Sequence, residues 1–136
     1  MLGRKALSAA FAGACLIAAP PALAAGLQAG AARVDVTPAA DKLPKTMRGI
    51  LDPIFARAIV VDDGRAKAAL VTIDAGAIPP PMWTSVSQRV EKEFGIPATR
   101  LLLTATHTHS VPFGGGVVNY EDGIIAAIRQ AMRRVE

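Results

Sequence analysis

Hydrophobic and polar positions change rhythm several times along the chain, and each rhythm predicts a different element. Residues 32–37 alternate and stop at a proline, which predicts a short strand after a lead-in of small residues. Residues 54–61 are rich in branched side chains, and Asp63-Gly64 stands between this run and the next, 66–73, as a hairpin-turn signal. We therefore expect 54–61 and 66–73 to pair as antiparallel strands.

The second half of the chain shows a helical rhythm followed by an apolar run. Apolar positions recur at spacings of three and four from Trp83 to Phe94, which predicts an amphipathic helix. This helix should begin near the prolines of 77–81 and end at Gly95. The apolar run at 99–106 then predicts a buried strand.

Strand, helix and strand in this order predict a βαβ unit, in which 67–74 and 101–107 run parallel. Because both strands are continuously apolar, we expect the sheet to be covered on both faces. After a loop at 111–118, Asn119 can cap a last helix that ends near Glu136 with the sheet unfinished. The predicted fold class is α/β, a mixed sheet with an Asp-Gly hairpin and a βαβ unit, forming an incomplete N-terminal part of a larger catalytic domain.

The first 24 residues have the layout of a secretory signal peptide. Arg4 and Lys5 precede an uncharged, mostly apolar run at 6–19, and Ala-Leu-Ala at 22–24 fits a cleavage site. The run is short for a membrane span, and an uncleaved anchor is the alternative interpretation. We therefore expect export to the periplasm or the medium, with 25–136 as one partial domain.

Composition narrows the classes of partner. The one cysteine, Cys15, lies in the expected signal peptide, so the mature chain would have neither a disulfide nor a cysteine ligand. The formal charge of +4 falls to +2 without Arg4 and Lys5, and basic residues do not interleave with aromatic ones. We therefore expect no nucleic-acid partner, and the sequence leaves the oligomeric state open.

Both histidines of the chain, His107 and His109, follow the last apolar strand. The two-residue period of a strand places them side by side on one face. Neutral imidazole is a favoured ligand of zinc and neighbouring transition metals. The pair therefore predicts half of a metal site, or one ligand beside a proton donor. A strand end held by hydrogen bonds is the alternative.

Asp74 ends the preceding parallel strand, so it should lie at the same sheet edge as His107 and His109, where ligands gather in such sheets. Its carboxylate would either orient an imidazole behind the metal or cap the strand by accepting backbone N–H groups. Ser110 lacks the Gly-x-Ser-x-Gly elbow of a nucleophile, and we interpret it as a turn residue. The glycine run at 114–116 is interpreted as a loop.

Residues 102–112, Leu-Leu-Thr-Ala-Thr-His-Thr-His-Ser-Val-Pro, resemble the Thr-His-Thr-His-Ser-Gly-Pro signature of the neutral/alkaline (non-lysosomal) ceramidase family. Segments 32–38 and 51–58 resemble the family's first two strands, and the hairpin follows in the family's order. The resemblance covers about residues 30–135. Val111 stands where the family commonly has glycine.

Members of this family are secreted or membrane-associated zinc amidases that hydrolyse the N-acyl bond of ceramide to sphingosine and a fatty acid. The resemblance implies that His107 is a zinc ligand and that His109 contacts the reacting oxygen. It also implies Zn²⁺ as cofactor, a ceramide-like lipid as substrate and transient contact with a membrane surface. The family's other zinc ligands and its active-site serine lie far downstream, and Tyr120 does not match the ligating tyrosine. We therefore expect the 136-residue chain alone to be inactive.

Two other functions stay open beside an N-terminal fragment of a ceramidase-like hydrolase. A non-catalytic remnant or binding module would keep the strand framework without the chemistry. A related hydrolase would act on another amide or ester, and the sequence does not specify an acyl-chain preference.

Overall fold

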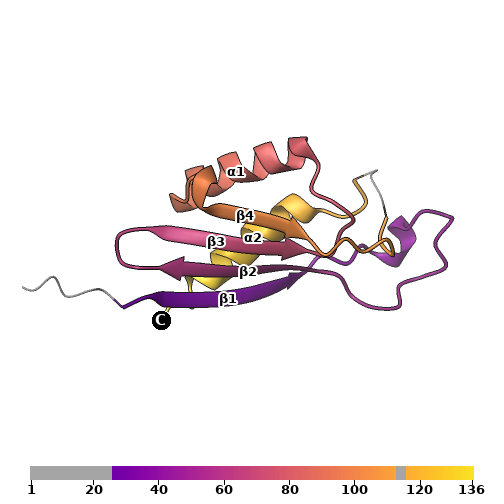
Figure 1. The fold of residues 1–136 in the computed structure, drawn as a ribbon. Helices are drawn as coiled ribbons and strands as arrows, with labels where there is room; N and C mark the ends of the chain where they lie inside the picture. The colour runs from indigo at the N-terminus through magenta and orange to yellow at the C-terminus, as the bar shows by residue number, and fades with distance from the viewer. Residues whose placement is uncertain (1–25, 113–115) are drawn as a thin grey trace, which may run out of the picture.

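A computed structural model describes residues 26–112 and 116–136 of the chain. Within these ranges, four strands form one sheet in the order β1-β2-β3-β4, accompanied by two α-helices (Figure 1). The signal peptide expected at 1–24 lies outside the described residues, as do two glycines of the expected loop at 114–116.

The strands and helices follow the order that the sequence predicts. The strands are β1 (Gln28–Asp35), β2 (Phe55–Asp62), β3 (Lys67–Ile73) and β4 (Leu101–Ala105); the helices are α1 (Pro80–Phe94) and α2 (Tyr120–Met132), with short 3₁₀ turns η1 (Ala40–Lys42) and η2 (Ala98–Arg100). β1 begins four residues before the predicted strand. The small residues expected to be a lead-in instead pair with the last residues of β2, for example Gln28 with Asp62.

The hairpin and the βαβ unit are confirmed. β2 and β3 pair antiparallel, and Asp63 Oδ1 accepts hydrogen bonds from the backbone N–H groups of Arg65 and Ala66 at 2.9 and 2.7 Å. β3 and β4 pair parallel through α1, which ends at Gly95 in a left-handed conformation with φ of 68°. Glycine adopts this conformation without the steric penalty of a side chain.

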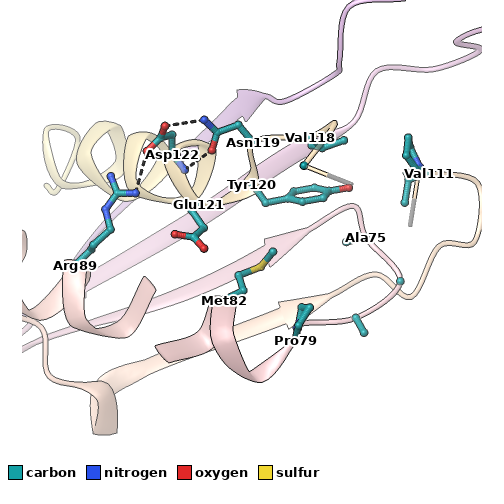
Figure 2. A pocket seen from close by; sticks show the side chains of 14 residues that line it. Ala75, Pro79, Met82, Arg89, Val111, Val118, Asn119, Tyr120, Glu121 and Asp122 are labelled. Atoms are coloured by element: carbon teal, nitrogen blue, oxygen red, sulfur yellow. Dashed lines mark hydrogen bonds and ion pairs between the residues drawn. The ribbon is translucent and has the colours of Figure 1, made fainter. Parts of the chain in front are cut away.

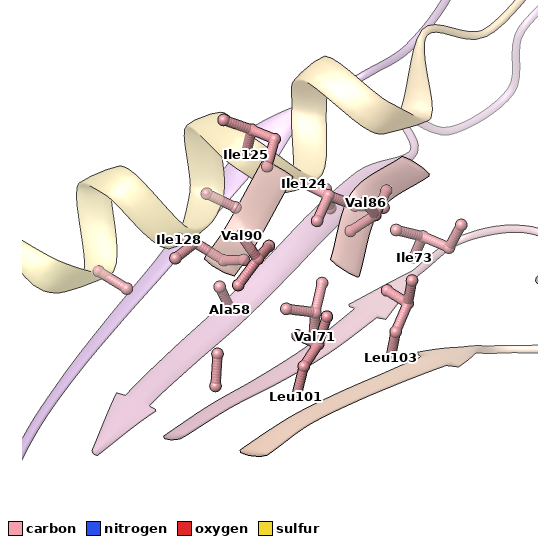
Figure 3. Packing of buried hydrophobic residues seen from close by; sticks show 14 of the residues in the cluster. Ala58, Val71, Ile73, Val86, Val90, Leu101, Leu103, Ile124, Ile125 and Ile128 are labelled. Carbon is pink, nitrogen blue, oxygen red and sulfur yellow. The ribbon is translucent and has the colours of Figure 1, made fainter. Parts of the chain in front are cut away.

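Both helices pack on the same face of the sheet and share one core with it (Figure 3). Alternate strand residues point into this core because side chains alternate between the faces of a strand. The residues at its centre are Ala58, Val71, Ile73, Leu101 and Leu103 of the sheet, and Val86, Val90, Ile124, Ile125 and Ile128 of the helices. Ion pairs of Arg89 with Asp122 and of Arg129 with Glu93 join the two helices.

The opposite face of the sheet is uncovered by the described residues, so the expected cover on both faces was wrong for this part of the chain. Ile59, Leu70 and Leu102 are neighbours on three adjacent strands and are 47%, 45% and 55% exposed. The reason lies in the topology, because α2 packs across β1 and β2 and continues the layer that α1 begins. The apolar sequences of the strands therefore predict that both faces are buried, whereas α1 and α2 bury only one of them.

The ends of α2 are held by specific contacts. Asn119 caps the helix as predicted: its Oδ1 accepts from Asp122 N at 3.2 Å, and its Nδ2 donates to Asp122 Oδ2 at 2.7 Å. At the other end, the helix packs so closely on β1 that a Cβ at Gly30 would lie 2.2 Å from the Ala131 carbonyl oxygen. Within the described part of the chain, no helix has the length and apolar character needed to cross a membrane.

Candidate functional site

The backbone turns sharply where the histidines begin. β4 ends at Ala105, and Thr106 N makes a last link to β3 by donating to Ile73 O at 3.0 Å. His107 then adopts a left-handed conformation with φ of 60°, which few residues other than glycine tolerate, although histidine does so more often than most. The strand alternation expected to carry both histidines was therefore wrong, because the strand ends first.

The two imidazoles nevertheless lie side by side, as the sequence predicted. Their Nε2 atoms are 3.5 Å apart, and their rings meet edge to face with centroids separated by 5.0 Å. Both side chains are exposed at the carboxyl end of the parallel strands. The turn at His107, and not the pleat of a strand, brings the two rings together.

The His107 ring is oriented by a backbone carbonyl. Its Nδ1 lies 2.6 Å from the oxygen of Gly76, three residues beyond the end of β3. Because a carbonyl oxygen only accepts, Nδ1 carries the hydrogen, and a neutral ring keeps its lone pair on Nε2. Metal-ligating histidines are commonly held in this way through their other nitrogen. The arrangement directs the Nε2 atom of His107 toward the ring of His109, whose Nε2 lies 3.5 Å away.

Asp74 holds the ends of two strands together. Its Oδ2 accepts from the Phe55 backbone N–H and from the Arg57 guanidinium, each at 2.9 Å. These contacts correspond to the strand-cap interpretation of Asp74, while Gly76 takes the orienting position toward His107. Asp74 therefore acts on the site through the backbone segment that leads from β3 to Gly76.

Tyr120 fixes the same segment from the helix side. Its hydroxyl donates to the Asp74 carbonyl oxygen at 2.7 Å, and the side chain is buried at the start of α2. Burial, with a smaller contribution from the Asp74 charge, raises the pKa of Tyr120 to about 12, so the phenol stays protonated near neutral pH. Sequence reasoning missed this contact, and the only signal was an aromatic residue beside the predicted Asn119 cap.

Two cavities border the loop of residues 106–112 that carries the histidines. The larger, of about 550 Å³, lies between the N-terminal ends of the helices, with Pro79, the N-cap of α1, and Met82 on one side and Asn119 and Tyr120 on the other (Figure 2). Its charged residues already have partners, as in the Arg89–Asp122 ion pair at 2.9 Å. This cavity therefore resembles a helix junction more than a binding site.

The smaller cavity, of about 400 Å³, is a cleft between the histidine loop and the segment that joins β1 to β2. The histidine loop contributes Thr108, Ser110 and Val111 to its wall. The facing segment contributes mainly aliphatic side chains, which are Leu43, Met47, Ile50, Leu51 and Ile54. A cleft with one largely aliphatic side, lined also by Asp52 and Asp74, thus opens beside the loop that contains the imidazole pair.

The imidazole pair fits part of a zinc site. Two nitrogen ligands about 2.0–2.1 Å from one tetrahedral zinc lie about 3.3–3.4 Å apart, close to the observed 3.5 Å between the Nε2 atoms. Among residues 26–112 and 116–136, no group of three or more metal-ligating side chains comes together. The described residues therefore supply one ligand or two, depending on whether His109 binds the metal, whereas a catalytic zinc usually needs three protein ligands.

Solved ceramidase structures share this fold, although no known protein-family profile matches the sequence. A ceramidase complexed with C2 and the neutral ceramidase from Pseudomonas aeruginosa each match with a TM-score of 0.68 and 24% sequence identity. Each match covers 81% of this chain and 22% of the solved chain. The ceramidase-like fold predicted from residues 102–112 is confirmed, and the chain spans about a fifth of the length of the ceramidases that it matches.

Proposed function

We propose that this chain is part of an exported, zinc-dependent, ceramidase-like amidohydrolase that cleaves the N-acyl bond of ceramide to sphingosine and a fatty acid. The observation that carries the proposal is the hydrogen bond from His107 Nδ1 to Gly76 O, which leaves Nε2 beside the ring of His109. The fold shared with two ceramidases supports the same function. Export would follow from the signal peptide proposed at 1–24.

The two histidines have different roles in this proposal. His107 Nε2 holds the metal, and Gly76 keeps the ring in the required tautomer and direction. When bound, zinc supplies a Lewis acid that lowers the pKa of water and polarises a carbonyl group. His109 donates a hydrogen bond to the reacting oxygen, where negative charge develops during attack on the amide. The remaining ligands come from outside the described residues.

The aliphatic side of the cleft supports a lipid as the substrate. Burial of a hydrocarbon chain there gains about 0.8 kcal/mol for each CH₂ group. Two carboxylates, Asp52 and Asp74, also line the cleft, and Asp74 is already paired with Arg57. The cleft also begins at the loop that carries both histidines, so a bound chain would place its head near them. These features favour ceramide over a small, polar amide.

A non-catalytic binding module of the same fold is a second candidate. It is favoured by the imidazole pair itself, since the described residues provide two donors where catalysis needs more. In that case the cleft would bind a lipid without cleaving it. A related hydrolase of another amide or ester would keep the chemistry and change the occupant of the cleft.

The experiment measures fatty-acid release from ceramide by a longer protein that contains this chain, beside the 136-residue chain alone. We expect the longer protein to be active, to lose activity on chelation and to regain it with zinc, while the chain alone is inactive. A fatty-acid ester and an N-acyl amino acid serve as comparison substrates. Cleavage of these but not of ceramide would support the related hydrolase, and binding without cleavage would support the module.

A further inference from the structure

The segment between β1 and β2 contains an exposed apolar pair, Ile50 and Leu51, which we call the tip. Leu51 is 96% exposed, more than any other large hydrophobic residue in the described part of the chain, and Ile50 beside it is 42% exposed. Single exposed apolar residues are ordinary in soluble proteins. These two are adjacent, however, and both also line the cleft that opens beside the histidine loop. The tip therefore forms the rim of the candidate binding cleft.

Three exposed cations lie on the same segment as the tip. They are Lys42, Lys45 and Arg48, and only Lys42 has an acidic neighbour, Asp41, at 3.7 Å. In the described ranges, no ion pair engages Lys45 or Arg48. The segment also has two exposed carboxylates, Asp41 and Asp52, so its cations exceed its anions by one. An apolar tip next to unpaired cations has the character of interfacial membrane-binding segments, in which apolar groups enter the acyl region and cations meet anionic headgroups.

We propose that this loop docks on an anionic lipid surface, with Ile50 and Leu51 inserted among the acyl chains and Lys45 and Arg48 at the headgroup phosphates. The choice of a lipid surface over a protein partner rests on the proposed function, since a lipid substrate must leave a bilayer. Because the tip borders the cleft, a hydrocarbon chain would pass from the membrane into the cleft without crossing water.

The outer face of the sheet provides a matched control. Leu102 is 55% exposed there, beside the exposed Leu70, and neither residue lines the cleft. Both sites are aliphatic and solvent-exposed, so a substitution at either costs the fold little. Leu51 lies on the same loop as Lys45 and Arg48, whereas Leu102 lies on the sheet. Docking through the loop would therefore insert position 51 and not position 102.

The experiment places a single tryptophan at the tip and asks whether it enters the membrane. In the full 136-residue chain carrying Trp83→Phe, which removes the one native tryptophan, Leu51→Trp is compared with Leu102→Trp. Vesicles contain phosphatidylcholine and phosphatidylglycerol, with or without brominated acyl chains. We expect the fluorescence of the tryptophan at position 51 to shift to the blue and to be quenched by bromine, and that of the tryptophan at position 102 to change little.

A second pair of variants tests the cations. Lys45→Gln with Arg48→Gln should weaken the insertion of the Leu51→Trp chain about 25-fold, since each cation near an anionic surface contributes about a fivefold factor. Lys92→Gln with Arg100→Gln removes the same charge from the opposite end of the sheet and should have little effect. The Leu51→Trp chain with its cations intact should insert into vesicles of phosphatidylcholine alone about as weakly as the Lys45/Arg48 variant inserts into the anionic vesicles.

Each alternative result is decisive. The proposal would be overturned if bromine did not quench the tryptophan at position 51, or if it quenched those at 51 and 102 equally. It would also be overturned if the Lys45/Arg48 variant inserted as well as the chain with both cations. The fluorescence reports the tip itself and requires no zinc or turnover. If the tip inserted while the longer protein proved inactive toward ceramide, the proposed function would be contradicted and the proposal of membrane docking would still hold.

Discussion

The sheet has one end at the β2–β3 hairpin and an opposite end at the loops that follow β3 and β4 (Figure 1). Polar side chains make different kinds of contact at these two ends. At the hairpin end, Asp63 accepts from two backbone N–H groups of its own turn, and Asp62 binds Gly64 N at 2.8 Å and Lys67 at 2.9 Å. All these contacts join residues within five positions of each other. At the opposite end, the contacts join distant segments, such as Tyr120 with Asp74 and His107 with Gly76.

This difference separates structural from functional polar groups. The hairpin carboxylates close a turn, and their contacts explain why the residues are there. At the other end, Asp74 and Tyr120 hold the backbone, and Gly76 holds one nitrogen of His107. The Nε2 atoms of the two imidazoles lie 3.5 Å apart at this end, beside the parallel strands. Chemistry is expected at that end of the sheet.

The largest expected effect on stability tests whether the hairpin end serves only the fold. A Cβ at Gly30 would meet backbone atoms of the last turn of α2 and of the residues after it, at 2.2 Å from Ala131 O and 2.8 Å from Arg134 C. We expect Gly30→Ala to lower the free energy of unfolding by about 3 kcal/mol, measured in urea, because backbone must move. Gly26→Ala, with nothing within 4 Å, is the control. A Gly30→Ala chain as stable as the native one would contradict this packing.

A smaller effect on stability is expected at the site end, joined to a loss of metal binding. Asp74→Ala removes the acceptor shared by Phe55 N and Arg57 and should cost about 2 kcal/mol in unfolding free energy. It should also weaken zinc binding in a titration, because Gly76, which orients His107, lies only two residues after Asp74. Asp74→Asn keeps one acceptor and should lose less of both. If Asp63→Ala weakened zinc binding as much, the two ends would not differ as described.

The smallest expected effect concerns acid stability at the hairpin end. The Lys67 ammonium lowers the pKa of Asp62, and the N–H groups of Arg65 and Ala66 lower the pKa of Asp63. Because the folded pKa lies below the unfolded value, each carboxylate stabilises the fold above about pH 4, and this contribution is lost as pH falls through the folded pKa. Asp62→Asn with Asp63→Asn should flatten the fall in Tm between about pH 4 and 2. An unchanged acid profile would exclude this contribution.

Features set by neighbouring residues could be predicted from the sequence. The Asp63-Gly64 hairpin, the Gly95 helix end and the Asn119 cap each depend on contacts within a few positions. The βαβ unit also follows from local patterns, because the crossover rule then fixes the parallel pairing of β3 and β4. The closeness of His107 and His109 was predicted correctly, but from a strand that ends before them.

Features set by the assembled fold could not be predicted from local patterns. The Gly76 carbonyl and the Tyr120 hydroxyl reach partners 31 and 46 positions away, and small backbone groups leave no signal of such contacts. The early start of β1 depends on pairing with β2, since its small residues have weak strand preference of their own. The uncovered face at Leu70 likewise reflects where both helices pack.

The zinc content of two single variants tests the central claim most directly. In a longer protein that contains this chain, zinc per molecule is measured for His107→Ala and for His109→Ala after extensive dialysis. The account predicts that His107→Ala loses its zinc, because Nε2 of the ring held by Gly76 is a ligand, while His109→Ala keeps most of it. Equal loss in both variants would make both residues ligands. Unchanged zinc in both would contradict the account and leave the histidines with a structural role.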